Sequence, residues 1–136
     1  MISCNDKQNK VTKSIKYPNK TSEMAQLMRQ MTTKLDSIKT KFDRNELIEL
    51  NLLNFPSIYN QKTTDASFDK PHLQPMSESF ELSAHNFNKQ PTKDNYSILI
   101  NNCIGCHQLS CPGPLMKINK LKINYWAFNQ KSRVLF

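Results

Sequence analysis

The sequence predicts an all-α fold, a bundle of three to four helices. Apolar residues recur at helical spacing in three separate segments, and prolines stand at or near the starts and ends of these segments. Glycine occurs only 2 times, which argues against a turn-rich all-β fold. With 136 residues, of which 38% are apolar and 22% charged, the chain has the length of one domain with a modest core.

The first helix is expected over residues 22–43. Ser22 can cap its start, and Glu23 follows in the first turn. The apolar residues that line one face of this helix are Met24, Leu27, Met28, Met31, Leu35, Ile38 and Phe42. Residues 46–53 admit two interpretations, a short second helix or an irregular segment that wraps over the core, and we favour the short helix.

Two more helices are expected over residues 73–89 and 93–110. Pro71 and Pro75 stand where the first of them begins, and proline is tolerated in a first turn. Residues 112–114, Pro-Gly-Pro, end the second helix. Residues 115–136 alternate Ile or Leu with Lys or Asn, and either lie back along the bundle or fray.

Residues 103–107 read Cys-Ile-Gly-Cys-His, the C-x-x-C-H pattern of c-type haem attachment. Cys103 and Cys106 are one helical turn apart, so both thiols can bond to the vinyl groups of one haem edge. His107 can turn its imidazole under the iron as the proximal ligand. The pattern therefore predicts one covalent haem c on the C-terminal helix of the bundle.

A zinc or iron–sulfur site formed by Cys103, Cys106, His107 and Cys111 is the main chemical alternative. Four ligands on one helix cannot easily surround a metal, and structural zinc sites usually pair two short clusters. A thioredoxin-like thiol pair would need a preceding strand. We therefore expect Cys111 to be a small thiol at the helix end. No arrangement of catalytic side chains stands out, so we expect no enzyme.

The N-terminal residues resemble the end of a bacterial lipobox, in which a small residue precedes a lipidated Cys, here Cys4. The charged and apolar parts of a signal peptide would lie upstream of Met1. Because haem attachment to C-x-x-C-H generally takes place outside the cytoplasm, we expect a periplasmic lipoprotein tethered through Cys4. A cytoplasmic protein with a chance Ser-Cys pair is the alternative.

These patterns predict that the chain has three parts. Residues 1–20 are polar and Lys-rich and are expected to form a disordered tether, 21–123 the haem-binding bundle, and 124–136 a C-terminal tail. No stretch approaches the roughly 20 apolar residues of a membrane-spanning helix.

Residues 96–108, 111–114 and 24–31 together resemble the cytochrome c′ family, the four-helix-bundle c-type cytochromes, in particular a subgroup of the Bacteroidetes type. The resemblance covers residues 22–123. It implies that Met28 stands where the family presents a residue to the distal side of the iron. High-spin members carry an apolar residue there, which leaves a site open for small gases, whereas electron-carrying relatives carry a Met ligand.

The chain departs from the family pattern in three ways. Its second helix is short or absent, residues 111–114 replace the basic helix end, and the tail after Ile123 has no counterpart. Met24, Met28 and Met31 can also be simple core filler. Met76 and Met116 are weaker candidates for a distal ligand, and His72 and His85 are expected to be surface or capping residues.

These expectations combine into a periplasmic single-electron carrier with His107 and Met28 as iron ligands. The alternatives are a haem protein that binds NO or CO at an open distal site, and a family member that receives no haem because it lacks an export signal. The net charge of +8 suits an acidic redox partner. Because the Lys residues are spread along the chain, we expect no nucleic acid. Members of the family often dimerise through their first helix, so the resemblance leaves a homodimer open.

Overall fold

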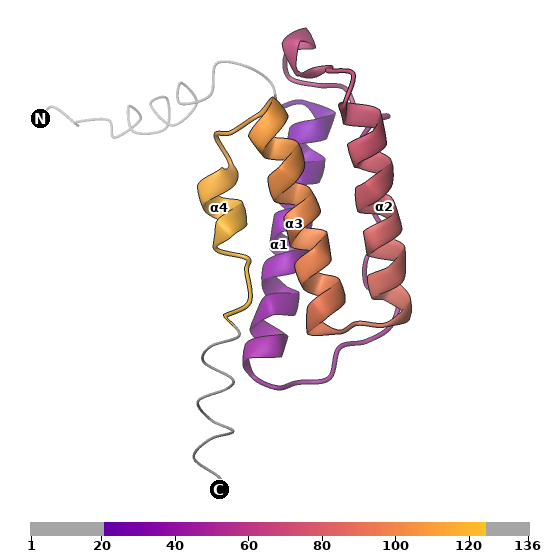
Figure 1. Cartoon of the computed structure of the whole chain (residues 1–136), viewed down its shortest axis with the longest axis vertical. Coiled ribbons are helices and arrows are strands. Elements are labelled where there is room, and N and C mark those ends of the chain that lie inside the picture. Colours follow the sequence, from indigo (N-terminus) through magenta and orange to yellow (C-terminus); the bar gives the residue numbers. More distant parts are fainter. Residues whose placement is uncertain (1–20, 125–136) are drawn as a thin grey trace, which may run out of the picture.

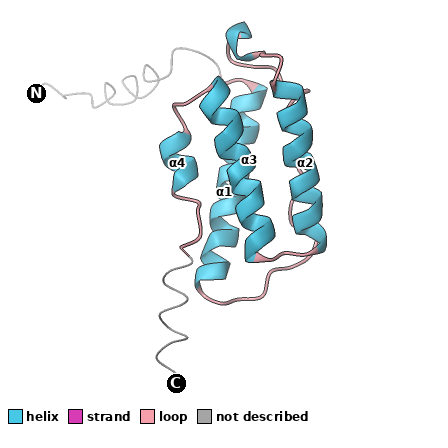
Figure 2. Cartoon of the chain, viewed as in Figure 1, coloured by secondary structure: helices cyan, strands magenta, loops and turns pink. Residues whose placement is uncertain are grey.

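The structure is a computed structural model and describes residues 21–124. The expected tether with Cys4, and all of the expected tail except Asn124, lie outside the described residues. Residues 21–124 contain four α-helices and one short 3-10 helix joined by irregular segments, and no strand (Figure 2). The predicted all-α class is therefore confirmed for this part of the chain.

Three long helices lie side by side, and a short fourth helix lies beside the third (Figure 1). They are α1 (Glu23–Asp43), α2 (Leu73–Lys89), α3 (Lys93–Ser110) and α4 (Leu115–Asn119), with the 3-10 helix η2 (Ala66–Phe68) before α2. α3 packs most closely against α2 and α4, whereas α1 meets the other helices mainly through side chains. None of the described helices is both long and apolar enough to cross a bilayer.

The three long helices agree with the sequence prediction to within one residue at each end. Ser22 caps α1, where its hydroxyl accepts a hydrogen bond of 3.1 Å from the amide of Ala25. Thr92 caps α3 in the same way through the amide of Asn95, also at 3.1 Å. The core face of α1 consists of Leu27, Met31, Leu35, Ile38 and Phe42, all members of the predicted apolar stripe.

The favoured short helix over 46–53 is wrong, and this segment is irregular. Leu53 exchanges two hydrogen bonds with the Asn88 side chain, at 2.8 Å from its amide and 2.7 Å to its carbonyl. α1 ends and α2 begins at opposite ends of the bundle (Figure 1), so the connection must span its length. An extended chain covers about 3.3 Å per residue against 1.5 Å for a helix, which favours the irregular path.

The segment after α3 returns along the bundle as far as the structure describes it. α4 is little more than one helical turn long. The sequence had left open whether this segment lies along the bundle or frays. Ile118 and Leu121 are both buried, at 6% and 3% exposure, and attach this segment to the bundle.

Tyr96 on α3 connects the parts of the core. Its side chain is fully buried, and its ring packs edge-on against Phe42 of α1 at 5.6 Å and Phe87 of α2 at 6.3 Å between centroids. Its hydroxyl donates to the carbonyl of Leu121 at 2.7 Å and lies 3.3 Å from the carbonyl of Leu35. Burial raises the pKa of this phenol well above its usual value of 10.0, so the group stays a neutral donor.

We expect Tyr96→Phe to lower the free energy of unfolding by about 1–2 kcal/mol, because it leaves the buried carbonyl of Leu121 without its donor. Denaturant unfolding followed by circular dichroism measures the change. Tyr59→Phe is the matched control, since Tyr59 is 44% exposed. Equal stability of the two variants would show that the Tyr96 hydroxyl contributes nothing to the bundle.

Candidate haem-attachment site

The C-x-x-C-H residues lie in the second half of α3, at the end of the bundle where α1 and α2 begin (Figure 1). Cys103, Cys106 and His107 are all partly buried, and the two Cys side chains pack against the core. Positions three and four apart on a helix share one face, so the three side chains leave α3 on the same side.

His107 is held by a reciprocal pair of contacts with Cys111. The imidazole Nδ1 lies 2.9 Å from the Cys111 carbonyl oxygen, and the Cys111 amide donates to the His107 carbonyl at 3.0 Å. A carbonyl oxygen only accepts, so Nδ1 carries the proton and Nε2 keeps a lone pair free for a metal. Pro112 follows Cys111 and restricts its backbone to extended conformations, which helps hold this carbonyl in place.

Burial keeps both motif thiols protonated. It raises the pKa of Cys103 from 9.0 to about 12, and the neighbouring Cys106 adds to the increase. Burial also raises the pKa of Cys106, although a hydrogen bond from the Ser110 hydroxyl partly opposes that increase. In this arrangement neither sulfur is a reactive thiolate at neutral pH.

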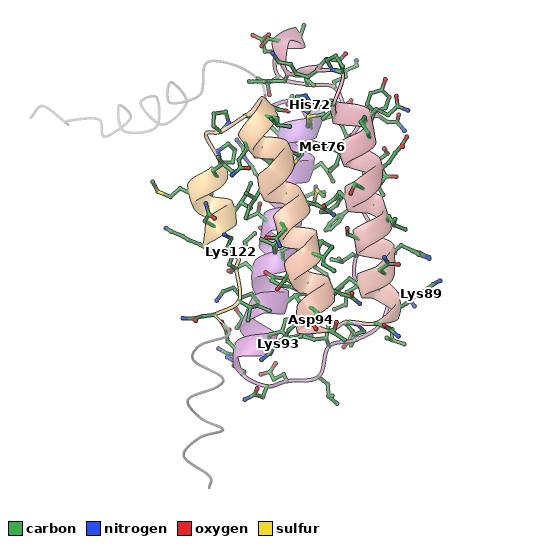
Figure 3. The ribbon with its side chains drawn as sticks, viewed as in Figure 1. His72, Met76, Lys89, Lys93, Asp94 and Lys122 are labelled. Carbon is green, nitrogen blue, oxygen red and sulfur yellow. The ribbon has the colours of Figure 1, made fainter. Side chains whose placement is uncertain are left out.

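Ser110 and His72 are neighbours of the motif that the sequence did not indicate. The Ser110 hydroxyl contacts the Cys106 thiol, which lies one turn earlier on α3, and the Nε2 atom of His72. Figure 3 shows His72 at the start of α2. His72 stands at the capping position of α2 but makes no capping bond there. Ser110 could have been identified from the sequence, because it lies four residues, about one helical turn, after Cys106. His72 could not, because its contact with Ser110 depends on how α2 packs against α3. His85 is exposed, as expected.

The five methionines of the described chain differ in position. Met24 and Met28 are partly buried on the core and Met31 is fully buried in it, whereas Met76 is partly buried beside His72 at the start of α2 (Figure 3). Met116 is 75% exposed, which makes it a poor candidate for a ligand inside the bundle.

The register between α1 and α3 places Met28 level with the motif. α1 and α3 run antiparallel, and Tyr96 is at the height of Leu35. Met28 lies about two turns before Leu35, and Cys103 lies about two turns after Tyr96. The structure therefore brings Met28 and Cys103 to the same level of the bundle, on the two helices whose backbones are less closely packed.

Two surface hollows lie away from the motif, one bordered by Asn86, Lys89, Gln90 and Asn95, and the other by the α1 residues Arg29, Gln30, Thr33, Lys34 and Ser37. The motif residues themselves fit a haem, because two thiols and an oriented imidazole share one face of α3.

Among residues 21–124, no three His, Cys, Asp or Glu side chains gather closely enough to hold a metal ion. Cys103, Cys106, His107 and Cys111 accordingly do not form such a group in this arrangement. This does not bear on haem, which would be held by covalent bonds to the Cys residues.

No family model, curated protein or solved structure matches the chain. The resemblance to cytochrome c′ therefore stays a prediction.

We expect Cys103 to react slowly with iodoacetamide in the folded, haem-free chain. At pH 9 the unfolded thiol is half ionised, whereas a pKa of about 12 leaves about one thiol in a thousand ionised. The folded state therefore loses stability as the pH rises from 9 toward 12, since the unfolded chain releases this proton first. Mass spectrometry of peptides from samples with and without urea measures the rates of Cys103 alkylation. A Cys103 that is alkylated equally fast in both conditions would contradict this burial.

Proposed function

We propose that this protein is a c-type cytochrome that carries single electrons outside the cytoplasm. In this proposal Cys103 and Cys106 attach one haem c through thioether bonds, and His107 binds the iron through Nε2. When bound, the haem supplies an iron that alternates between two oxidation states. The protein residues hold and orient that group, surround it with apolar side chains and keep water from it.

The observation that carries the proposal is the fixed orientation of His107. A histidine that serves only as packing does not need a defined tautomer, but an axial ligand does, because one nitrogen must keep its lone pair. The 2.9 Å contact from Nδ1 to the Cys111 carbonyl meets this requirement. It occurs on the His that directly follows the second Cys of the motif.

The apolar surroundings of the two thiols support the same function. Leu99 and Ile100 are buried one turn before Cys103, and Ile104 is partly buried on the core. An apolar, close-packed environment reorganises little when the charge of a cofactor changes by one electron. An iron held on this face would therefore change its oxidation state with little reorganisation of the surrounding side chains.

We also propose that Met28 is the distal ligand. Its partly buried side chain and its level opposite Cys103 support this choice over Met116, which is exposed, and over Met31, which is buried in the core. A thioether ligand raises the reduction potential, which suits an electron carrier. The alternative is that Met28 only fills space in the core and does not bind the iron.

The periplasmic location and the membrane tether through Cys4 complete the proposal. They are supported by the lipobox-like residues around Cys4 and by the need for haem attachment outside the cytoplasm. Either a soluble or a lipid-tethered form would have the same haem site.

The haem itself can be tested by expressing the chain behind an export signal in cells that contain a haem maturation system. A haem-stained denaturing gel should show a band for the parent chain, and the double variant Cys103→Ala/Cys106→Ala should lose it, because no thioether bond remains. Cys111→Ala is the control and should keep its stain, since it preserves the motif and the backbone carbonyl that contacts His107. A parent chain that stays unstained while the maturation system loads another cytochrome would end the proposal.

The distal ligand can be tested by absorption spectroscopy of the haem-loaded protein. The parent should be low-spin, and Met28→Leu should become high-spin and bind carbon monoxide, because leucine cannot ligate iron. Met24→Leu is the matched control, one turn earlier on α1 and also partly buried, and should leave the spectrum unchanged. A parent that is already high-spin and binds carbon monoxide would favour the gas-binding alternative over electron transfer.

A further inference from the structure

Asp94 is the last acidic residue of the sequence. No Asp or Glu follows it in the sequence, whereas Lys117, Lys120 and Lys122 fall in the described part of this stretch. Basic and acidic side chains are nearly balanced over residues 21–94. None of the three Lys side chains forms an ion pair with a described residue. The segment after α3 therefore carries three Lys side chains that no ion pair with a described residue neutralises.

The outward side of α4 and of the turn after it combines this charge with one exposed apolar side chain. Ile118 faces the bundle and is 6% exposed, whereas Met116 is 75% exposed. The three Lys side chains are exposed as well, and Figure 3 shows Lys122 on the segment that follows α4. We call Met116, Lys117, Lys120 and Lys122 the α4 surface.

We propose that the α4 surface is the docking site of an acidic protein partner. Lys side chains that form no ion pair attract carboxylates and speed the encounter, while a single exposed apolar side chain gives the contact a centre that excludes water. Because α4 packs on α3, a partner bound here would lie beside the helix that carries Cys103 and Cys106. Its use in electron transfer rests on the proposed function, but docking itself requires no haem.

An anionic membrane is the other surface that basic residues can bind. Helices that lie on membranes insert a whole apolar face. In α4 the side chain of Ile118 is already buried in the bundle, so that Met116 is the exposed large apolar side chain that remains. One methionine gives too little apolar area for insertion, which favours a protein partner.

The first test measures binding of the full chain to a polyglutamate peptide at low salt by isothermal titration calorimetry. Lys117→Gln/Lys120→Gln should weaken binding by about three- to tenfold, as expected for the loss of two exposed charge pairs. Lys70→Gln/Lys89→Gln removes the same charge from exposed positions outside the α4 surface and should change binding less than twofold. Equal weakening in both variants would overturn the proposal, because binding would then follow net charge alone.

A second peptide of the same charge, with leucines between the glutamates, tests the apolar centre. The parent should bind it more tightly than polyglutamate, and Met116→Ser should abolish the difference. Binding to phosphatidylglycerol vesicles without binding to either peptide would overturn the proposal in favour of a membrane. Both titrations use the haem-free chain and then the haem-loaded protein, so that a missing haem and a missing docking site are separate results.

Discussion

The bundle depends on the burial of one polar aromatic residue, Tyr96. Its ring contacts α1 and α2, and its hydroxyl fixes the segment after α4 through the carbonyl of Leu121. A buried hydroxyl is stable only when it is paired, so these elements must meet in one arrangement for the core to close. The antiparallel register of α1 against α3 follows from that arrangement, and with it the residues that lie level with the C-x-x-C-H motif.

Helical periodicity was enough to predict α1, α2 and α3, because each of them buries one continuous apolar face. It failed over 46–53, where Leu53 is paired with Asn88, a residue far away in the sequence. The exposure of Leu47, at 94%, shows that apolar character alone does not bring a side chain into the core. Local patterns cannot reveal such a connection, because its path is set by the distance between two helix ends.

Part of the candidate site could be predicted from the sequence, and part of it could not. The face shared by Cys103, Cys106 and His107 follows from helical spacing. The contact between His107 and the Cys111 carbonyl depends on how the helix ends, and the contact between His72 and Ser110 depends on the packing of α2 against α3. Sequence reasoning treated Cys111 as an ordinary thiol, whereas its backbone is the part that matters to the histidine.

The long connection between α1 and α2 has a consequence for the order of assembly. α2 and α3 are joined by a short turn, so their contacts are local, while α1 must close a loop of residues 44–72 before it docks. Local contacts form early in folding, and non-local ones later. We therefore expect α1 to join the bundle after α2 and α3 have paired. A chain whose α2–α3 hairpin is already formed would present the motif face open to a large planar group, and the docking of α1 would then cover it.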